Sequence, residues 1–202
     1  MSTKYYGNGN VKPVKKSESH GTHVAGIIAA ERNNGLGANG VANNVEIMAV
    51  RTVPNGDEYD KDVALAIRYA VDNGAKIING SFGKYYSPHS DWVRDAITYA
   101  GKHDVLFIIA AGNEGKDLDT VAVYPNDQVD NGSEVSDTFL TVGALEPKYG
   151  SNMVAGFSNY GKNNTAITFI SNKNSSDSLN IYDNKSYKYN KYDIFQKTIM
   201  YS

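Results

Sequence analysis

The sequence contains no cysteine, and this absence excludes disulfide bonds and thiolate metal sites. The longest apolar run covers residues 105–111, which is far too short to cross a bilayer as a helix. The formal net charge is only -2, with both signs scattered, so the charge pattern predicts neither nucleic-acid nor membrane binding. The first residues are polar, so we expect no signal peptide, and the sequence leaves the compartment open.

Glycine and proline are both absent from the last part of the chain. All 19 glycines precede residue 162, and residues 162–202 contain no proline. Asn, Lys, Ser and Tyr supply 24 of those 41 residues. Compact α/β domains need glycine at helix ends and tight turns, so we expect two segments. Residues 1–161 form an ordered domain in this interpretation, and residues 162–202 form a divergent polar tail that is weakly ordered or holds a strand or two.

Patterns typical of helices and of strands alternate along residues 20–142. Helical spacing is found over residues 20–31, from Asp60 to Gly74 and from Ser90 to Gly101. Short apolar runs indicate strands at Val45–Val50, Lys76–Asn79, Val105–Ala111 and Thr138–Val142. Strands separated by helices form a parallel sheet. The predicted fold is therefore three-layer α/β, with a mostly parallel sheet and helices on both faces.

Residues 19–26, which read Ser-His-Gly-Thr-His-Val-Ala-Gly, carry the most specific motif of the chain. They resemble the histidine segment of the subtilisin-like serine proteases, also called subtilases or peptidase family S8. The resemblance implies that His20 opens a helix and acts as general base, taking a proton from a serine hydroxyl. His23 fits packing better than metal binding, because no third ligand accompanies the two histidines. We expect no metal site there.

A second motif, Ala110-Ala111-Gly112-Asn113-Glu114-Gly115, resembles the oxyanion segment of the same family. The resemblance implies that the Asn113 side chain donates a hydrogen bond to the oxyanion of a tetrahedral intermediate. His20 and Asn113 are 93 residues apart, close to the separation of about 91 in subtilisin. The structural alternative is an asparagine that simply favours a left-handed turn after a strand.

Weaker matches concern substrate binding. Ser81, Phe82 and Gly83 resemble the strand end that pairs with the substrate backbone, a form of β-augmentation. Ala111 and Gly112 belong to the same binding region, and Tyr124 resembles a wall of the primary specificity pocket, with an ordinary loop as the alternative. Residues 157–161 resemble a stretch that precedes the family's serine segment. The expected partner is a peptide or protein substrate, with neither nucleic acid nor membrane.

Residues 33–38, Asn-Asn-Gly-Leu-Gly-Ala, resemble the calcium loop of the family. Asparagine oxygens and backbone carbonyls are suitable ligands for a hard cation. An Asn/Gly turn accounts for the same residues without an ion. We therefore expect no cofactor, and calcium at Asn33 and Asn34 remains the alternative.

The chain departs from the family at two members of the catalytic triad, which in subtilisin follow the order Asp, His, Ser. The aspartate stands about 32 residues before the histidine, but none of the 19 residues before His20 is Asp. The serine stands about 157 residues after it, where Ser175, Ser176 and Ser178 have no flanking glycine. We therefore expect a domain that is truncated at both ends and inactive as it stands.

These observations leave three functions open. The first is a truncated or degenerate serine endopeptidase, whose parent hydrolyses peptide bonds through an acyl-enzyme. The second is a pseudoprotease that binds peptides without cleaving them. The third is a fragment that needs a second polypeptide to supply the missing triad members. Family members are commonly secreted, which does not decide the compartment of this chain.

Overall fold

The computed structural model describes residues 9–12, 19–53, 56–129, 132–146, 154–161, 169–170 and 199–201. Its helices are α1 (His20–Ala29), α2 (Asp60–Asp72) and α3 (Ser90–Lys102). Its strands are β1 (Ala49–Arg51), β2 (Ile77–Gly80), β3 (Leu106–Ala110), β4 (Gln128–Val129), β5 (Ser133–Glu134), β6 (Phe139–Val142), β7 (Ala144–Leu145), β8 (Phe169–Ile170) and β9 (Ile199–Tyr201). A search of the described helices finds none with the length and apolar character needed to cross a membrane.

Five strands form the main sheet in the order β1-β9-β2-β3-β6, and every neighbouring pair is parallel. The predicted parallel sheet is therefore confirmed, with β3 in its interior. Strand β9 comes from the far end of the chain and separates β1 from β2, an order that the sequence did not predict. Residues 162–202 also supply β8, and the rest of the predicted tail lies outside the described residues.

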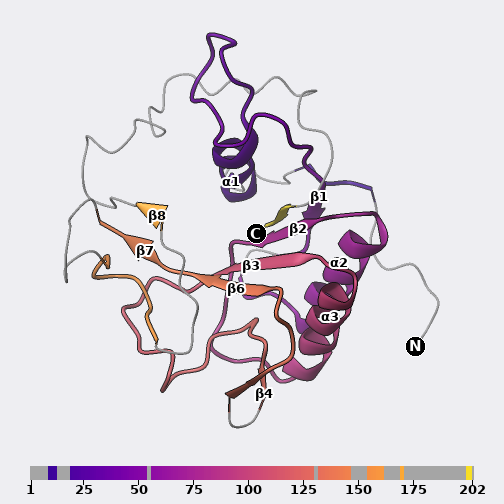
Figure 1. The fold of residues 1–202 in the computed structure, drawn as a ribbon, viewed down its shortest axis with the longest axis vertical. Coiled ribbons are helices and arrows are strands. Elements are labelled where there is room, and N and C mark those ends of the chain that lie inside the picture. Colours follow the sequence, from indigo (N-terminus) through magenta and orange to yellow (C-terminus); the bar gives the residue numbers. More distant parts are fainter. Residues whose placement is uncertain are drawn as a thin grey trace.

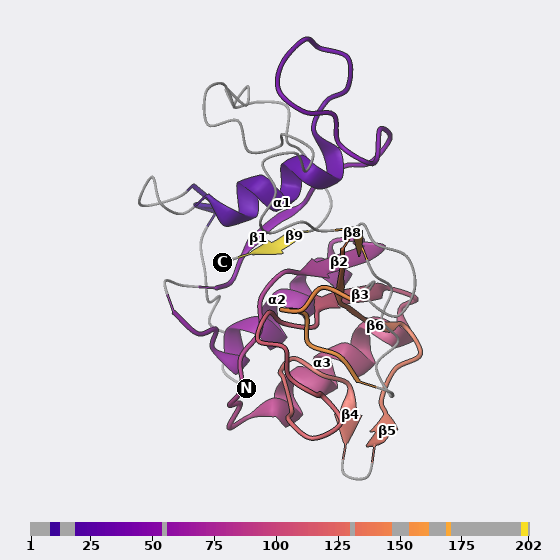
Figure 2. The same ribbon diagram turned by 90° about the vertical axis from the view of Figure 1, so that its left-hand side faces the viewer.

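The main core lies between the sheet and two helices. The 3–4 spacing of apolar residues turns one face of α2 and one face of α3 toward β2 and β3, and the most buried side chains there are Val63, Ile67, Ile78, Ile97 and Phe107. Helix α1 lies away from this pair of helices, beside β1 and β9 (Figures 1 and 2). A smaller cluster around Ala25 and Ile47 packs there. Helices thus cover both sides of the sheet, as the predicted three-layer fold requires.

Candidate active site

The candidate substrate residues follow two neighbouring strands at the same edge of the sheet. Gly80, the last residue of β2, is paired with Ile109 of β3. Ser81–Gly83 leave β2 from this edge, and residues 111–115 leave β3 beside them. Carboxyl ends of parallel strands are where ligands gather in α/β folds. The structure therefore brings together the two segments that the sequence analysis assigned to substrate binding.

Asn159, which is only 2% exposed, holds the candidate oxyanion loop in shape. Its side-chain oxygen accepts from the backbone N–H of Glu114 at 3.2 Å and of Lys116 at 2.8 Å. Its side-chain nitrogen donates to the carbonyl of Ala111 at 2.8 Å. Gly112 has a φ of 106°, and a Cβ placed there would lie 3.2 Å from Asn159 Cγ. Glycine is thus required at this position both for its backbone angle and for its lack of a side chain.

Asn113 itself is exposed at the turn of this loop. Its backbone N–H donates to Glu114 Oε2 at 2.9 Å, so this amide is already occupied. The hydroxyl of Tyr85 donates to the same Glu114 oxygen and lowers the pKa of that carboxyl. The ammonium of Lys116 lies 3.6 Å from the centre of the Tyr85 ring. These contacts brace the loop and leave the Asn113 side chain at the surface, where a peptide carbonyl could meet it.

The second wall of the site joins Gly83 to Tyr124. Lys84 and Tyr124 exchange two backbone hydrogen bonds, of 2.9 and 2.8 Å, in an isolated antiparallel bridge. A Cβ on Gly83 would lie 3.3 Å from the Tyr124 carbonyl oxygen. Gly83 is exposed, whereas Phe82 is 9% exposed and belongs to the core. Only part of the predicted Ser81–Gly83 edge is therefore open to a peptide side chain.

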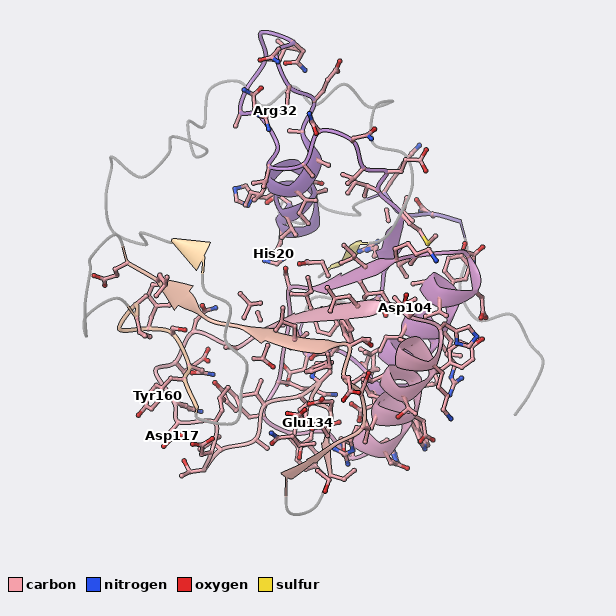
Figure 3. All side chains as sticks on the ribbon, in the orientation of Figure 1. His20, Arg32, Asp104, Asp117, Glu134 and Tyr160 are labelled. Carbon is pink, nitrogen blue, oxygen red and sulfur yellow. The ribbon has the colours of Figure 1, made fainter. Side chains whose placement is uncertain are left out.

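His20 is the first residue of α1, as the motif predicted. Figure 3 shows it at the end of α1 that is directed toward the sheet. Its side chain is exposed, yet the surrounding protein desolvates the ring enough to lower its pKa, and nearby His23 adds to this effect. A lowered pKa favours the neutral imidazole that a general base requires. That His20 and Asn113 face one cleft stays a prediction.

The loop at residues 33–39 has the geometry of an asparagine turn. Asn33 has a φ of 62°, and its N–H donates to Asn39 Oδ1 at 2.9 Å. Asn34 Oδ1 accepts from the N–H of Leu36 at 2.9 Å. Among the described residues, no group of three or more His, Cys, Asp or Glu side chains could hold a metal. The calcium alternative at Asn33 and Asn34 is not tested by these contacts and stays a prediction.

A parallel sheet with an anchored glycine-asparagine loop at its carboxyl edge, and a histidine at the start of a neighbouring helix, defines the subtilisin-like class of α/β proteins. The model of the subtilase family matches residues 2–198. The chain belongs to the subtilase family.

Curated relatives and a solved structure agree with this assignment. The chain is 40% identical over 145 residues to the thermophilic serine proteinase of Bacillus sp. (strain AK1), covering 71% of this chain and 32% of that protein. It is 37% identical over 131 residues to thermitase of Thermoactinomyces vulgaris, covering 60% of this chain and 46% of thermitase. A protease structure from Pseudoalteromonas arctica PAMC 21717 superposes with a TM-score of 0.62 at 29% identity, over 76% of this chain and 44% of that one. The chain thus spans less than half the length of each.

Sequence reasoning missed two residues that organise this site. Asn159 was noticed only as part of a family-like stretch, although a polar residue beside the equally buried Ser158 indicates a structural hydrogen-bonding role. Lys84 was not singled out, because a lysine after a glycine gives no sign that its ammonium is buried. Ser175, Ser176 and Ser178 lie outside the described residues.

Proposed function

We propose that this chain is the body of a subtilase serine endopeptidase domain, which binds extended peptides but does not hydrolyse them by itself. The substrate backbone lies along Ser81–Gly83, with Ala111 and Gly112 on one side and Tyr124 on the other. The observation that carries the proposal is the loop at residues 111–116, held by Asn159 next to the end of β2.

The chemistry that the site offers is that of one half of an acyl-transfer centre. His20, kept neutral by the surroundings that lower its pKa, accepts the proton of an attacking serine hydroxyl. The Asn113 amide donates to the oxygen of the former carbonyl, which carries the negative charge of the tetrahedral intermediate. Such a donor is worth about 10²–10³ in turnover in subtilisin. These two roles require a nucleophile and an orienting carboxylate to complete the reaction.

The proposed inactivity follows from the residues available for those two remaining roles. Residues 1–19 contain no aspartate, and a position about 32 residues before His20, where subtilisin has its aspartate, lies upstream of residue 1. The serines near residue 177 have no glycine beside them, whereas a nucleophile that substrate approaches closely needs small neighbours. Residues 1–19 therefore supply no aspartate to orient the imidazole, and we propose that catalysis would need this carboxylate from residues outside this sequence.

A fluorophosphonate probe tests this proposal, because covalent labelling requires an activated serine. We expect no labelling of the purified chain. We expect the fluorescence anisotropy of a fluorescein-labelled hexapeptide library to rise when the chain is added, because the peptides bind. A variant with Asn159→Ala, which disturbs the oxyanion loop, is expected to bind more weakly. Labelling that disappears in His20→Ala would show that the chain is an active protease. Labelling that requires a second polypeptide would instead favour a fragment completed in trans.

A further inference from the structure

A buried lysine lies in the wall of the candidate site that joins Gly83 to Tyr124. Lys84 directly follows Gly83 and is only 8% exposed. Its ammonium nitrogen lies 2.7 Å from Asp60 Oδ1 and donates to the carbonyl oxygen of Glu58 at 2.6 Å. Asp60 is the first residue of α2, and Glu58 immediately precedes the N-cap residue, Tyr59. The side chain of Lys84 therefore fastens the end of the Ser81–Gly83 segment to this helix.

Asp60 collects further contacts from the same stretch of chain. Its carboxylate accepts from the Ser87 hydroxyl at 2.7 Å and from the backbone N–H of His89 at 3.0 Å. Asp60 is 6% exposed, so its carboxylate is largely shielded from bulk water, and its bonds to Ser87 and His89 are partly buried. One carboxylate thus fixes the path of residues 84–89 against the first turn of α2, where a negative charge is also favoured by the helix dipole.

The negative charge of Asp60 balances the positive charge of Lys84 in this cluster. Burial raises the pKa of the Asp60 carboxyl, but the hydrogen bonds from Lys84, Ser87 and His89 outweigh that effect and lower it on balance. Burial raises the pKa of the neighbouring Glu58. Asp60 is therefore the ionised partner of Lys84. A buried ammonium is stable only in contact with such a partner, so the pair holds one geometry.

The backbone of Lys84 links this ion pair to Tyr124, which lies in the same wall of the site as Gly83. Its N–H and carbonyl form both hydrogen bonds of the bridge to Tyr124. A displacement of Lys84 would move Gly83 on one side and Tyr124 on the other. Lys84, Asp60 and Tyr124 line one small cavity, together with residues that include Val63, Ser90 and Asn126.

We propose that Lys84 and Asp60 are positioning residues whose buried ion pair holds the Lys84–Tyr124 bridge in place, and thereby the wall of Gly83 and Tyr124 against which an extended peptide lies. The peptide as occupant rests on the proposed function. The support that the ion pair gives to the Lys84–Tyr124 bridge does not depend on the proposed function.

The double variant Lys84→Met/Asp60→Asn tests this role, because it removes both charges while the asparagine still offers an oxygen to Ser87 or His89. We expect the amide protons of Lys84 or its replacement and of Tyr124 to exchange about tenfold faster, with α3 amides unchanged. We expect hexapeptide binding to weaken about tenfold while the thermal midpoint stays within a few degrees. The matched control is Lys61→Met/Asp62→Asn, which removes the neighbouring exposed pair separated by 3.6 Å.

Each outcome decides either the positioning role of the ion pair or the effect of the bridge on peptide binding. Unchanged exchange at both bridge amides in a folded double variant would overturn the positioning role. Equal peptide affinity in the presence of faster amide exchange would show that the Lys84–Tyr124 bridge does not affect peptide binding. If the unsubstituted chain binds no peptide, the proposed function fails, and the exchange measurement still decides whether the ion pair holds the bridge. A change of similar size in the control pair would show a general charge effect and would also overturn the proposal.

Discussion

At the scale of single residues, the site depends on side chains that never touch a substrate. Asn159 satisfies two backbone donors and one backbone carbonyl of the oxyanion loop, and its nitrogen also donates to the Tyr85 hydroxyl at 3.2 Å. An amide is the only uncharged side-chain group that offers both an acceptor and two donors in this geometry. Loop shape and the position of Asn113 therefore follow from one buried residue in a segment distant in sequence.

Replacing Asn159 by alanine is expected to lower the free energy of unfolding by about 2–4 kcal/mol, because buried backbone donors lose their acceptor. Urea denaturation followed by circular dichroism measures this change. The matched control is Asn44→Ala at an exposed position, which should change stability by less than about 0.5 kcal/mol. Equal urea midpoints for the two variants would contradict the anchoring role.

Asp127 predicts a pH dependence of stability. Burial, together with the nearby charge of Glu134, raises the pKa of Asp127 from 3.8 to about 6. The folded chain thus keeps a proton that the unfolded chain releases, so the stability contributed by Asp127 is fully present below pH 4 and is lost as the pH rises through about 6. Asp127→Asn should therefore stabilise the protein at pH 8, by at most about 3 kcal/mol, and leave it unchanged near pH 4.

The measurement is the urea midpoint of Asp127→Asn relative to the unsubstituted chain at several pH values. Asp137→Asn serves as the control, since Asp137 is an exposed aspartate in the same region. A stabilisation that is equal at pH 4 and pH 8 would contradict the titration of Asp127 as its cause.

At the scale of elements, apolar periodicity was a good guide within the chain's body. The predicted helix starts at His20, Asp60 and Ser90 are confirmed, since each coincides with the beginning of a regular apolar stripe. Strand β1 is only three residues long and begins four residues later than predicted, because the apolar residues from Val45 include side chains that pack around α1 or remain exposed. Sequence patterns detect which residues are apolar but not which neighbour covers them.

Contacts between residues far apart in the sequence could not be predicted from apolar periodicity. Asn159 owes its role to loop partners 43 to 48 residues away, and Lys84 owes its role to Asp60 and Glu58, which are 24 and 26 residues away. No local spacing encodes those contacts. The motif residues His20, Ala111, Gly112 and Asn113 could be named from the sequence because a family resemblance supplied the distant relation. The burial of the Lys84 ammonium could not be predicted from the sequence, since lysine is rarely buried.

The end of α1 predicts a strict requirement for glycine at position 40. Residues 40–42 hydrogen-bond back to the last turn of α1, and a Cβ on Gly40 would lie 2.7 Å from the Ala29 carbonyl carbon. Because the obstacle is backbone, a side-chain rotation cannot relieve it. Gly40→Ala should cost about 2 kcal/mol or more in unfolding free energy by denaturant titration. Gly9→Ala, with nothing within 4 Å, is the control, and an equal effect there would contradict this explanation.

At the scale of the whole molecule, the sheet joins strands that are far apart in the sequence, β1 at residues 49–51 and β9 at residues 199–201. Among the described strands, β1 pairs only with β9, and β9 also pairs with β2 through Asn79 and Gly80. The α1–β1 unit that carries His20 therefore connects to the main sheet through backbone hydrogen bonds of the last strand. The predicted alignment of the candidate base with the substrate segments depends on that strand.

Deleting residues 199–202 is expected to lower the free energy of unfolding by about 2–4 kcal/mol, since several ladder hydrogen bonds are lost at about 1 kcal/mol each. Trypsin cleavage after Arg51 should accelerate, because β1 then becomes an unpaired strand. Deletion of Ser202 alone is the control. Equal rates of cleavage at Arg51 in both truncations would show that β9 does not secure β1.

The position of β9 also has a consequence during synthesis. A ribosome completes β2 by residue 80 and reaches residue 199 only after a further 119 codons, or roughly 6–24 s at ordinary elongation rates. Throughout that interval the edges of β1 and β2 that pair with β9 lack this partner strand. The gap between these edges closes only when residues 199–201 pair with both of them, so the edges are open to wrong pairing until then.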